Sequence, residues 1–567
     1  MMDKWINRMI IKKVIANGQK AKKELAKNCA SAGQVSQNLL LTILRDNAET
    51  EYGKEHGFAS IKSAAEYRRK VPFSTYDDYA PYIERMVDSG EKDLITTYPI
   101  RHYAVSSGTV GVPKHIPVSQ RTLDLYSAYG CNIDFAVMDE WYRQKTGRSF
   151  PAGKGLYALE AREMYMDNGL PKGPISATTI KPVKKFIPYI FSSPWEVISP
   201  KGNMDMKYLK IRYALAEPEL TFMAGAFMTA IVDLMDYMKG HWPMLVADIR
   251  EGKINPDVVM PPETRELLEG RMKPDPVRAD ALQAVFEEGF DTPIVPRLWK
   301  HMSWIAAIGT GDFKSYTDKM RDYAGPDIPM DFTVYGASES LMAVANKAED
   351  DAFVLIPDSG FYEFIPMTGD DDSKTLLLDE LLPGRDYEIV LTNLSGFYRY
   401  RIGDVIRVVG YEGQSPRLRF VYRKNQMVNI AGEKTNAESL AWSVSEFARE
   451  TGCIVADYSV YADTDAVPGR YVVLVEPDRP LAMERMAEYT RIVEEKLGFA
   501  NPSFGDKVAK GVLGPTQLYF EQLETYALYR DLMVMKGISP NQLKPVRVID
   551  TPMKEKFFFG LIEKEES

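Results

Sequence analysis

The sequence predicts an α/β protein with a large N-terminal domain of helix-flanked β-sheets, a β-rich subdomain within it, and a small mobile α+β C-terminal domain. Between about residues 100 and 400, short apolar runs alternate with helical stretches, a pattern that favours sheets covered by helices. From Tyr387 to Ile430 the pattern changes to closely spaced strands. A polar break at Arg423–Gln426 then precedes a shorter mixture of strands and helices, which predicts the second domain.

The first part of the chain, to about residue 90, predicts helices joined by polar links. Ser36–Arg45 has a short amphipathic pattern that starts at a serine able to cap a helix. Beyond residue 100 a helix is expected over Phe227–Met238. The apolar runs that predict strands of the main sheets are Leu156–Leu159, Trp304–Ile308 and Phe332–Tyr335.

The β-rich subdomain is predicted from three runs. These are Glu388–Thr392, Val405–Val409 and Leu418–Tyr422, with a glycine- and proline-containing turn at 410–416 between the last two. Because Arg423–Gln426 breaks the pattern, we expect a hinge there, with domains at 1–423 and 424–567. In the second domain we expect a strand at 471–475 and helices at 483–497 and 520–535.

Composition limits the classes of protein that this chain can belong to. With 567 residues, 45% of them hydrophobic, it can bury the cores of two or more domains. Its apolar runs are far shorter than the ~20 residues of a membrane span. A net charge of −9 argues against a broad nucleic-acid-binding surface. The three cysteines, Cys29, Cys131 and Cys453, form no pairing or metal-binding pattern, which suits a reducing compartment and predicts a cytoplasmic protein.

The N-terminus is basic and amphipathic. Asn7, Arg8, Lys12 and Lys13 interrupt its apolar residues, so it does not fit a secretory signal. We expect a plain surface helix, with contact to a membrane surface as the alternative.

The segment from Ser106 to Ser119 has the composition of an anion-binding loop. Its glycines let backbone N–H groups approach an anion, its hydroxyl residues add donors, and Lys114 adds a positive charge. The glycine spacing does not match the Walker pattern, which disfavours a P-loop kinase or GTPase. An ordinary polar turn is the alternative.

Tyr335–Glu339 follows the apolar run at Phe332, so we expect it at the end of a buried strand, where α/β sheets bind ligands. Gly336 and Ala337 would admit the flat face of a base, Ser338 a phosphate, and Glu339 a magnesium ion. Ser340 stands where a nucleophile elbow requires glycine, so a hydrolase is excluded. A purely structural role is the alternative.

Asp404 follows a glycine at a predicted strand turn, a position suited to accept both hydroxyls of a ribose. The alternative is an ion pair with Arg399, Arg401 or Arg407. The five histidines are scattered, so neither a zinc site nor a Ser-His-Asp triad has support.

Together and in this order, the three motifs resemble the adenylate-forming superfamily, which includes acyl-CoA synthetases and firefly luciferase. More specifically, the chain resembles the plant auxin-responsive family of acyl acid amido synthetases, which couple auxin, jasmonate or benzoates to amino acids. The stretches that carry this closer resemblance lie between about residues 100 and 550. They are His241–Gly252, Phe361–Pro366, Gly396–Gly410, Phe420–Asn425, Tyr461–Tyr471 and Gly537–Pro545.

The resemblance implies a role for each matching residue. Lys544 matches the C-terminal lysine that swings in for adenylation, and Glu339 matches the Mg²⁺ ligand. Asp404 matches the ribose-binding aspartate and Arg423 the arginine before the hinge. The other implied ATP contacts are Ser106, Ser107, Thr109, Gly111 and Lys114 on the phosphate loop, Thr310 and Gly311 on a second loop, and Tyr335, Gly336, Ala337 and Ser338 on the adenine and α-phosphate motif.

The implied activity is adenylation of a small carboxylic acid by ATP with Mg²⁺, followed by acyl transfer to an amine, for which an amino acid is expected. The alternatives are an acyl-CoA ligase and a catalytically inactive nucleotide-binding protein. Phe227 and Phe361 are candidates for the wall of the acyl site, with core packing as the alternative for Phe227. The chain departs from the family at Ser359–Phe361 and over 160–225, so the acid of the plant enzymes is not carried over.

Overall fold

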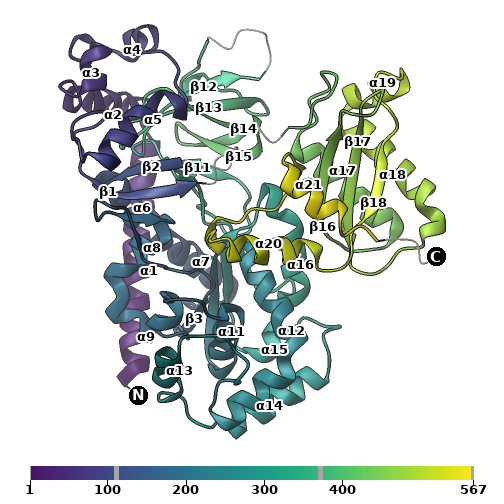
Figure 1. Ribbon diagram of the computed structural model, residues 1–567. Coiled ribbons are helices and arrows are strands. Elements are labelled where there is room, and N and C mark those ends of the chain that lie inside the picture. The colour runs from purple at the N-terminus through teal and green to yellow at the C-terminus, as the bar shows by residue number, and fades with distance from the viewer. Residues whose placement is uncertain (1, 107–113, 368–373, 425–426, 564–567) are drawn as a thin grey trace. The chain divides into compact units, whose positions relative to one another are not determined.

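The computed structural model describes residues 2–106, 114–367, 374–424 and 427–563 (Figure 1). The chain divides into two compact units. The large unit comprises Met1–Ile308, Met320–Ile402 and Ile406–Arg419. The small unit comprises Gly309–Lys319, Gly403–Val405 and Phe420–Ser567, so neither unit is continuous in sequence.

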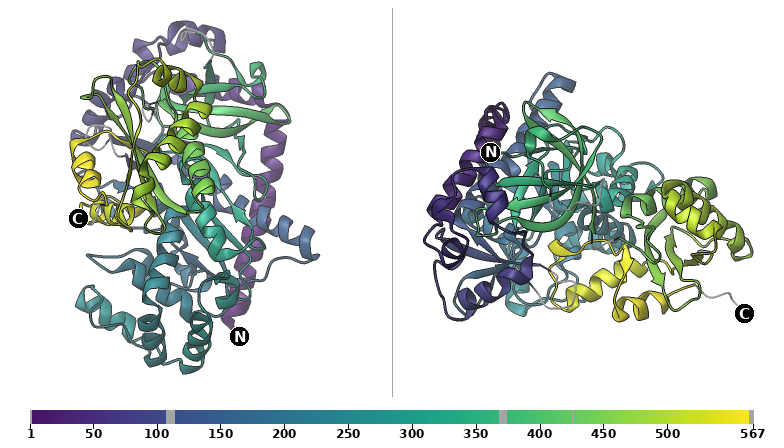
Figure 2. Two further views of the ribbon diagram at one scale, coloured as in Figure 1. Left: turned by 90° about the vertical axis from the view of Figure 1, so that its right-hand side faces the viewer. Right: turned by 90° about the horizontal axis from the view of Figure 1, so that it is seen from above.

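The large unit begins with a long helix, α1 (Met2–Cys29), which is the purple helix of Figures 1 and 2. As expected the N-terminus is helical and partly exposed, with Trp5 and Met9 in solvent, but Ile11, Ile15 and Leu25 are buried. The buried face packs on α7 (Cys131–Thr146). The other helices of this unit are α2 (Ala32–Asp46), α3 (Glu51–Glu55), α4 (Ala64–Lys70), α5 (Tyr76–Asp88), α6 (Gln120–Tyr129), α8 (Ile175–Ile180), α9 (Ile187–Ile190), α10 (Trp195–Ile198), α11 (Met206–Ala216), α12 (Met228–Glu251), α13 (Pro262–Glu269), α14 (Pro276–Glu287) and α15 (Val295–Leu298).

A parallel sheet of order β3-β6-β7-β8 confirms the predicted α/β fold class. Helices α11 and α12 pack against it, and the rings of Phe222 and Trp304 on paired strands stack with centroids 5.2 Å apart. The predicted strand at 304–308 is β7, and the predicted helix at 227–238 is the start of α12. The strands are β3 (Lys154–Tyr157), β6 (Leu220–Phe227), β7 (Trp304–Ile308) and β8 (Met330–Asp331).

The predicted β-rich subdomain corresponds to a seven-stranded sheet of order β12-β13-β14-β15-β11-β10-β9. The three predicted strands are confirmed as parts of β13, β14 and β15, and most of their residues are buried. Gly413, with φ +59°, makes the turn between β14 and β15. The strands are β9 (Val334–Ala337), β10 (Ser340–Val344), β11 (Phe353–Leu355), β12 (Phe361–Pro366), β13 (Asp386–Thr392), β14 (Tyr400–Glu412) and β15 (Ser415–Arg423).

A third sheet of the large unit has the order β2-β1-β5-β4. Its β1 and β2 form an antiparallel pair in which Ser106 faces Lys114. The strands are β1 (Ile100–Ser106), β2 (Lys114–Ser119), β4 (Met164–Tyr165) and β5 (Pro171–Gly173).

The small unit is built on a sheet of order β18-β17-β16-β19, covered by helices over two apolar clusters. The predicted strand at 471–475 is confirmed, but the helix expected from Phe520 begins only at Thr525. Phe520 ends a strand instead, because its backbone pairs with Val475 and its ring is buried. The elements are α17 (Ala437–Thr451), β16 (Val455–Asp463), β17 (Arg470–Pro477), α18 (Met486–Ala500), α19 (Pro502–Ala509), β18 (Gln517–Phe520), α20 (Thr525–Met535), β19 (Val548–Ile549) and α21 (Pro552–Phe559).

No helix formed by the described residues is both long enough and apolar enough to cross a bilayer.

Candidate active site

In the large unit, Tyr335–Glu339 forms one strand and the turn of the β9–β10 hairpin. The sequence predicted this motif at the end of a strand, and β9 ends within it at Ala337, where Gly336 and Ala337 pair with Leu341 and Ser340. Tyr335 is buried, whereas Ser338 and Glu339 are half-buried at the turn. The hairpin therefore presents the carboxylate and the hydroxyl together at its tip.

Glu339 is held by Asn393, which directly follows β13, and by Tyr400, the first residue of β14. The side-chain amide of Asn393 donates to the Glu339 carbonyl oxygen at 2.8 Å, and the Tyr400 hydroxyl donates to Glu339 Oε1 at 3.4 Å. On α6, the Tyr126 hydroxyl donates to the Ala337 carbonyl at 3.2 Å. Burial, aided by the Glu339 charge, raises the pKa of Tyr126, so this hydroxyl stays neutral and can donate.

The single carboxylate of Glu339 is suited to bind magnesium together with water and substrate phosphates. Among the described residues no cluster of three His, Cys, Asp or Glu side chains could bind a metal ion alone. Protein Mg²⁺ often takes only one or two carboxylates and receives its remaining ligands from water and substrate phosphates. A single half-buried carboxylate at a hairpin tip suits that arrangement.

The expected phosphate loop connects β1 and β2. Ser107, Thr109 and Gly111 lie outside the described residues. Ser106 is the last residue of β1, and Lys114 opens β2 with its Nζ 4.9 Å from the Tyr76 ring centroid. The cation–π contact with Tyr76 gives the Lys114 ammonium a defined position at the base of the loop.

In the small unit, Thr310 directly precedes a 3₁₀ turn, η3 (Gly311–Phe313), which Gly311 opens and which leads into α16 (Lys314–Ala324). The Thr317 hydroxyl donates to the Gly309 carbonyl at 2.7 Å. Gly311 has φ +60°, and a Cβ there would lie 3.1 Å from Phe420. The positive φ therefore favours glycine at this position, and a side chain there would also press on the Phe420 ring.

Asp404, within β14, lies beside Arg423 of β15. Arg423 Nε donates to Asp404 Oδ1 at 2.5 Å, and the aspartate is buried. The sequence offered Arg399, Arg401 and Arg407 as alternative partners, but these three pair with Glu363, Glu388 and Asp386, respectively. The structure thus links two residues, Asp404 and Arg423, that were assigned separately.

Lys544 is exposed in the segment between the short turn η7 (Pro540–Gln542) and β19. Its positive charge acts on Asp312 of the same unit. Burial raises the pKa of Asp312, while the positive charges of Arg547, Lys544 and Arg423 oppose that rise. Asp312 therefore faces three cations, two of which the sequence had assigned to ATP.

Asp312 and Arg547 were missed by the sequence analysis. The available signals were weak: Asp312 directly follows Thr310–Gly311, and Arg547 lies three positions after Lys544.

The two candidates for an acyl wall lie in different surroundings. Phe227 ends β6 opposite Ile308 of β7 and is half-buried. Phe361 is only 1% exposed and packs edge-on against Tyr67 in the core beneath α2 and α4. The position of Phe227, at the carboxyl end of a parallel strand, suits ligand contact better than that of Phe361.

Comparison with known families places these residues in context. The GH3 family N-terminal domain matches residues 21–330, its central domain residues 353–423, and its C-terminal domain residues 438–553. The chain belongs to the GH3 family. This confirms the resemblance to auxin-responsive acyl acid amido synthetases that the sequence motifs indicated.

Curated GH3 relatives align over nearly the whole chain. The probable indole-3-acetic acid-amido synthetase GH3.1 of Arabidopsis thaliana is 28% identical, over 93% of this chain and 90% of its own. The 4-substituted benzoates-glutamate ligase GH3.12 of the same plant is 28% identical, over 95% and 98%. Among solved structures, GH3.15 acyl acid amido synthetase has a TM-score of 0.83 at 24% identity and 95% coverage of both chains, so the fold is that of a GH3 protein.

Proposed function

We propose that this protein is an ATP-dependent acyl acid amido synthetase, which adenylates a small carboxylic acid and transfers the acyl group to an amino acid. The observation that carries the proposal is the match of all three GH3 domains, in order, along the chain. It is supported by the presence of Glu339, Asp404 and Lys544 in sequence motifs suited to nucleotide chemistry.

In the large unit, the β9–β10 hairpin binds the adenine and the α-phosphate. Gly336 and Ala337 leave room for a base against the strand, and Ser338 offers a hydroxyl to the phosphate. Glu339 holds Mg²⁺, which offsets charge on the phosphates when it is bound. Ser106 and Lys114, with Ser107, Thr109 and Gly111, contact the outer phosphates.

In the small unit, Asp404 accepts the ribose hydroxyls while Arg423 keeps its carboxylate oriented. Thr310 and Gly311 contact the nucleotide. Lys544 stabilises the negative charge that develops at the α-phosphate when the substrate carboxylate attacks it. The bond from the α-phosphorus to pyrophosphate breaks, and a mixed anhydride, the acyl adenylate, forms.

In the second half-reaction a neutral amine attacks the carbonyl carbon of the adenylate. AMP departs with the electrons of the acyl–oxygen bond, and an amide remains. Holding the reactants in line supplies much of the acceleration expected of such a step. A hinge at 423–426, of which residues 425 and 426 lie outside the described residues, would let the domain 424–567 present different residues in the two steps.

The decisive experiment measures pyrophosphate release with ATP over a panel of aryl and alkyl carboxylic acids. The panel includes indole-3-acetate, 4-substituted benzoates and 2,4-DB, which the names and titles of the relatives mention. Mass spectrometry of reactions with mixed amino acids then identifies the product. We expect acid-dependent pyrophosphate release and an amide with one or a few amino acids.

Two other outcomes would contradict the proposal. Release of AMP that is stimulated by coenzyme A without any amino acid would indicate an acyl-CoA ligase. ATP binding with no acid-dependent pyrophosphate release across the panel would indicate a nucleotide-binding protein without catalysis.

A further inference from the structure

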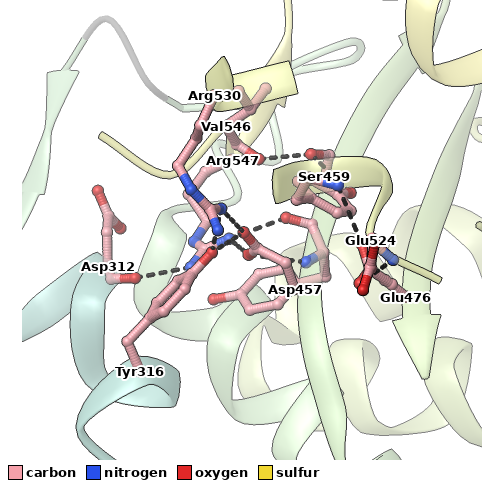
Figure 3. A network of polar contacts seen from close by, with 11 residues as sticks. Asp312, Tyr316, Asp457, Ser459, Glu476, Glu524, Arg530, Val546 and Arg547 are labelled. Carbon is pink, nitrogen blue, oxygen red and sulfur yellow. Dashed lines mark hydrogen bonds and ion pairs between the residues drawn. The ribbon is translucent and has the colours of Figure 1, made fainter. Parts of the chain in front are cut away.

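A buried polar cluster in the small unit links the Lys544 segment to the loop that carries Thr310 and Gly311. Its members are Asp457 on β16, Arg547 just before β19, Tyr316 on α16 and Arg530 on α20 (Figure 3). Asp457 is 1% exposed and Arg547 3%, so the cluster is shielded from water. None of these residues was assigned a role above.

Arg547 is the centre of the cluster. One amino group donates to Asp457 Oδ1 and, at 2.9 Å, to the Tyr458 carbonyl, while the other donates to the Asp312 carbonyl at 2.6 Å. Its guanidinium plane lies 4.0 Å from the Tyr458 ring centroid. Arg547 thus joins β16 directly to the residue after Gly311.

Tyr316 makes the second connection. Its hydroxyl donates to Asp457 Oδ2 and receives a hydrogen bond from Arg530 at 2.8 Å. Both oxygens of the Asp457 carboxylate are therefore engaged, one by Arg547 and one by Tyr316. Since Tyr316 lies on the first turn of α16, directly after η3, it fixes that loop through a second point.

The backbone after Lys544 is held in the same place. The Ser459 hydroxyl donates to the Val546 carbonyl, and the Val460 N–H donates to the Arg547 carbonyl at 2.9 Å. From Val548 the chain pairs with β16 as β19. The exposed Lys544 therefore projects from a segment whose next residues are immobilised on both sides of Arg547.

We propose that the cluster of Asp457, Arg547, Tyr316 and Arg530 is a positioning network for adenylation, which keeps Lys544 and the Thr310–Gly311 loop in one rigid frame. This inference rests on the proposed function. A buried carboxylate whose two oxygens are held by different side chains, here Arg547 and Tyr316, has few alternative arrangements, so it specifies geometry more strongly than apolar packing would. Acyl transfer from a preformed adenylate does not need Lys544 in that frame.

The test compares two tyrosines that differ in their hydroxyl partner. Tyr316→Phe removes the hydrogen bond to Asp457 and leaves the ring. Tyr471→Phe is the matched control, because Tyr471 is also buried in the same unit but its hydroxyl donates to Glu433 Oε1 at 2.7 Å, outside the cluster. Thermal unfolding of both variants measures the loss of stability that each deletion causes.

Two rates report on the network. The first is acid-dependent pyrophosphate exchange, and the second is labelling of Lys544 by an acyl-phosphate derivative of ATP, followed by mass spectrometry, which needs no acid substrate. We expect Tyr316→Phe to lower both rates by about tenfold at saturating ATP, the effect of losing one hydrogen bond to a charged group, and Tyr471→Phe to change neither rate by more than about twofold. Amide formation from synthetic acyl adenylate stays unchanged in both variants.

Equal rates for the two variants would overturn the inference, as would a parallel loss of both half-reactions in Tyr316→Phe. Arg547→Lys keeps the positive charge but loses the several N–H donors of the guanidinium. We expect this variant to lower pyrophosphate exchange and Lys544 labelling further than Tyr316→Phe does, again without slowing amide formation. A wild-type protein with neither pyrophosphate exchange nor labelling of Lys544 would instead contradict the proposed function.

Discussion

The small unit contains a buried carboxyl group whose ionisation controls stability. Glu521, directly after β18, is 0% exposed, and neither of its side-chain oxygens has a hydrogen-bond partner. Burial, with a further contribution from the Glu476 charge, raises the pKa of Glu521 from its ordinary value of 4.5 to about 8. The perturbation we consider is Glu521→Gln, which keeps the shape of the side chain and removes the ionisable group.

The pH dependence follows from proton binding. Below pH 4.5 the carboxyl is protonated in both the folded and the unfolded chain, and its contribution is constant. Between pH 4.5 and about 8 the unfolded chain loses the proton while the folded chain keeps it, so stability falls as pH rises. Each pH unit in this range lowers the free energy of unfolding by about 1.4 kcal/mol, so above pH 8 the total decrease approaches about 5 kcal/mol.

The assay is the thermal or urea unfolding of the small unit as a function of pH, for wild type and Glu521→Gln. Burying the glutamine amide of the variant also lowers the stability, but this effect does not change with pH. We therefore expect the free energy of unfolding of the variant to rise, relative to that of the wild type, by several kcal/mol between pH 5 and pH 9. Difference infrared spectroscopy should show a protonated carboxyl at pH 6 that the variant lacks.

Glu495→Gln is the control, because Glu495 is an exposed partner of Arg491 and should leave the pH profile nearly unchanged. Parallel pH profiles for wild type and Glu521→Gln would refute the reasoning.

Three further predictions concern the site and the packing of α1. Lys544→Ala should slow adenylate formation by about 10²–10³-fold and leave amide formation from preformed acyl adenylate nearly intact; equal losses in separate assays of the two half-reactions would contradict its role. Asp404→Ala should weaken ATP binding by about tenfold to a hundredfold in calorimetry, and unchanged affinity would exclude the ribose contact. Gly18→Ala should destabilise the protein by about 1–3 kcal/mol in urea unfolding, because its Cβ would lie 1.8 Å from the Asn132 carbonyl oxygen. The matched helical change Gly240→Ala has open space and should stabilise by about 0.5–1 kcal/mol; similar effects of both would argue against the close packing.

Much of the fold could be predicted because short runs of apolar residues in the sequence indicate which segments are buried. The stretches at 388–392, 405–409 and 418–422 are rich in β-branched and aromatic residues, most of their positions are buried, and the structure has strands at all three. The hairpin at Tyr335–Glu339 was harder to predict. An apolar run at Phe332 indicated a strand, but its extent depends on pairing with the following strand, which the local pattern does not specify.

In the candidate site, too, some features could be predicted from the sequence and others could not. The types of residue at Glu339, Asp404 and Lys544 were recognisable from motifs, whereas their partners were not. Asp404 has three arginines close in sequence but pairs with Arg423, nineteen positions away on the adjoining strand. Asp457 and Arg547 are ninety positions apart, and nothing in either local sequence indicates that they meet.

The placement of Gly309–Lys319 in the small unit has a consequence for recombination among GH3 proteins. The segment falls within the N-terminal family domain by sequence, which runs to residue 330, yet its Asp312 and Tyr316 complete the polar interior of the other unit. A chimera that exchanges only the C-terminal domain would join Asp457 and Arg547 of one parent to the α16 turn of the other. A chimera between relatives that is to keep this polar interior intact must therefore take residues 309–319 from the same parent as the C-terminal domain.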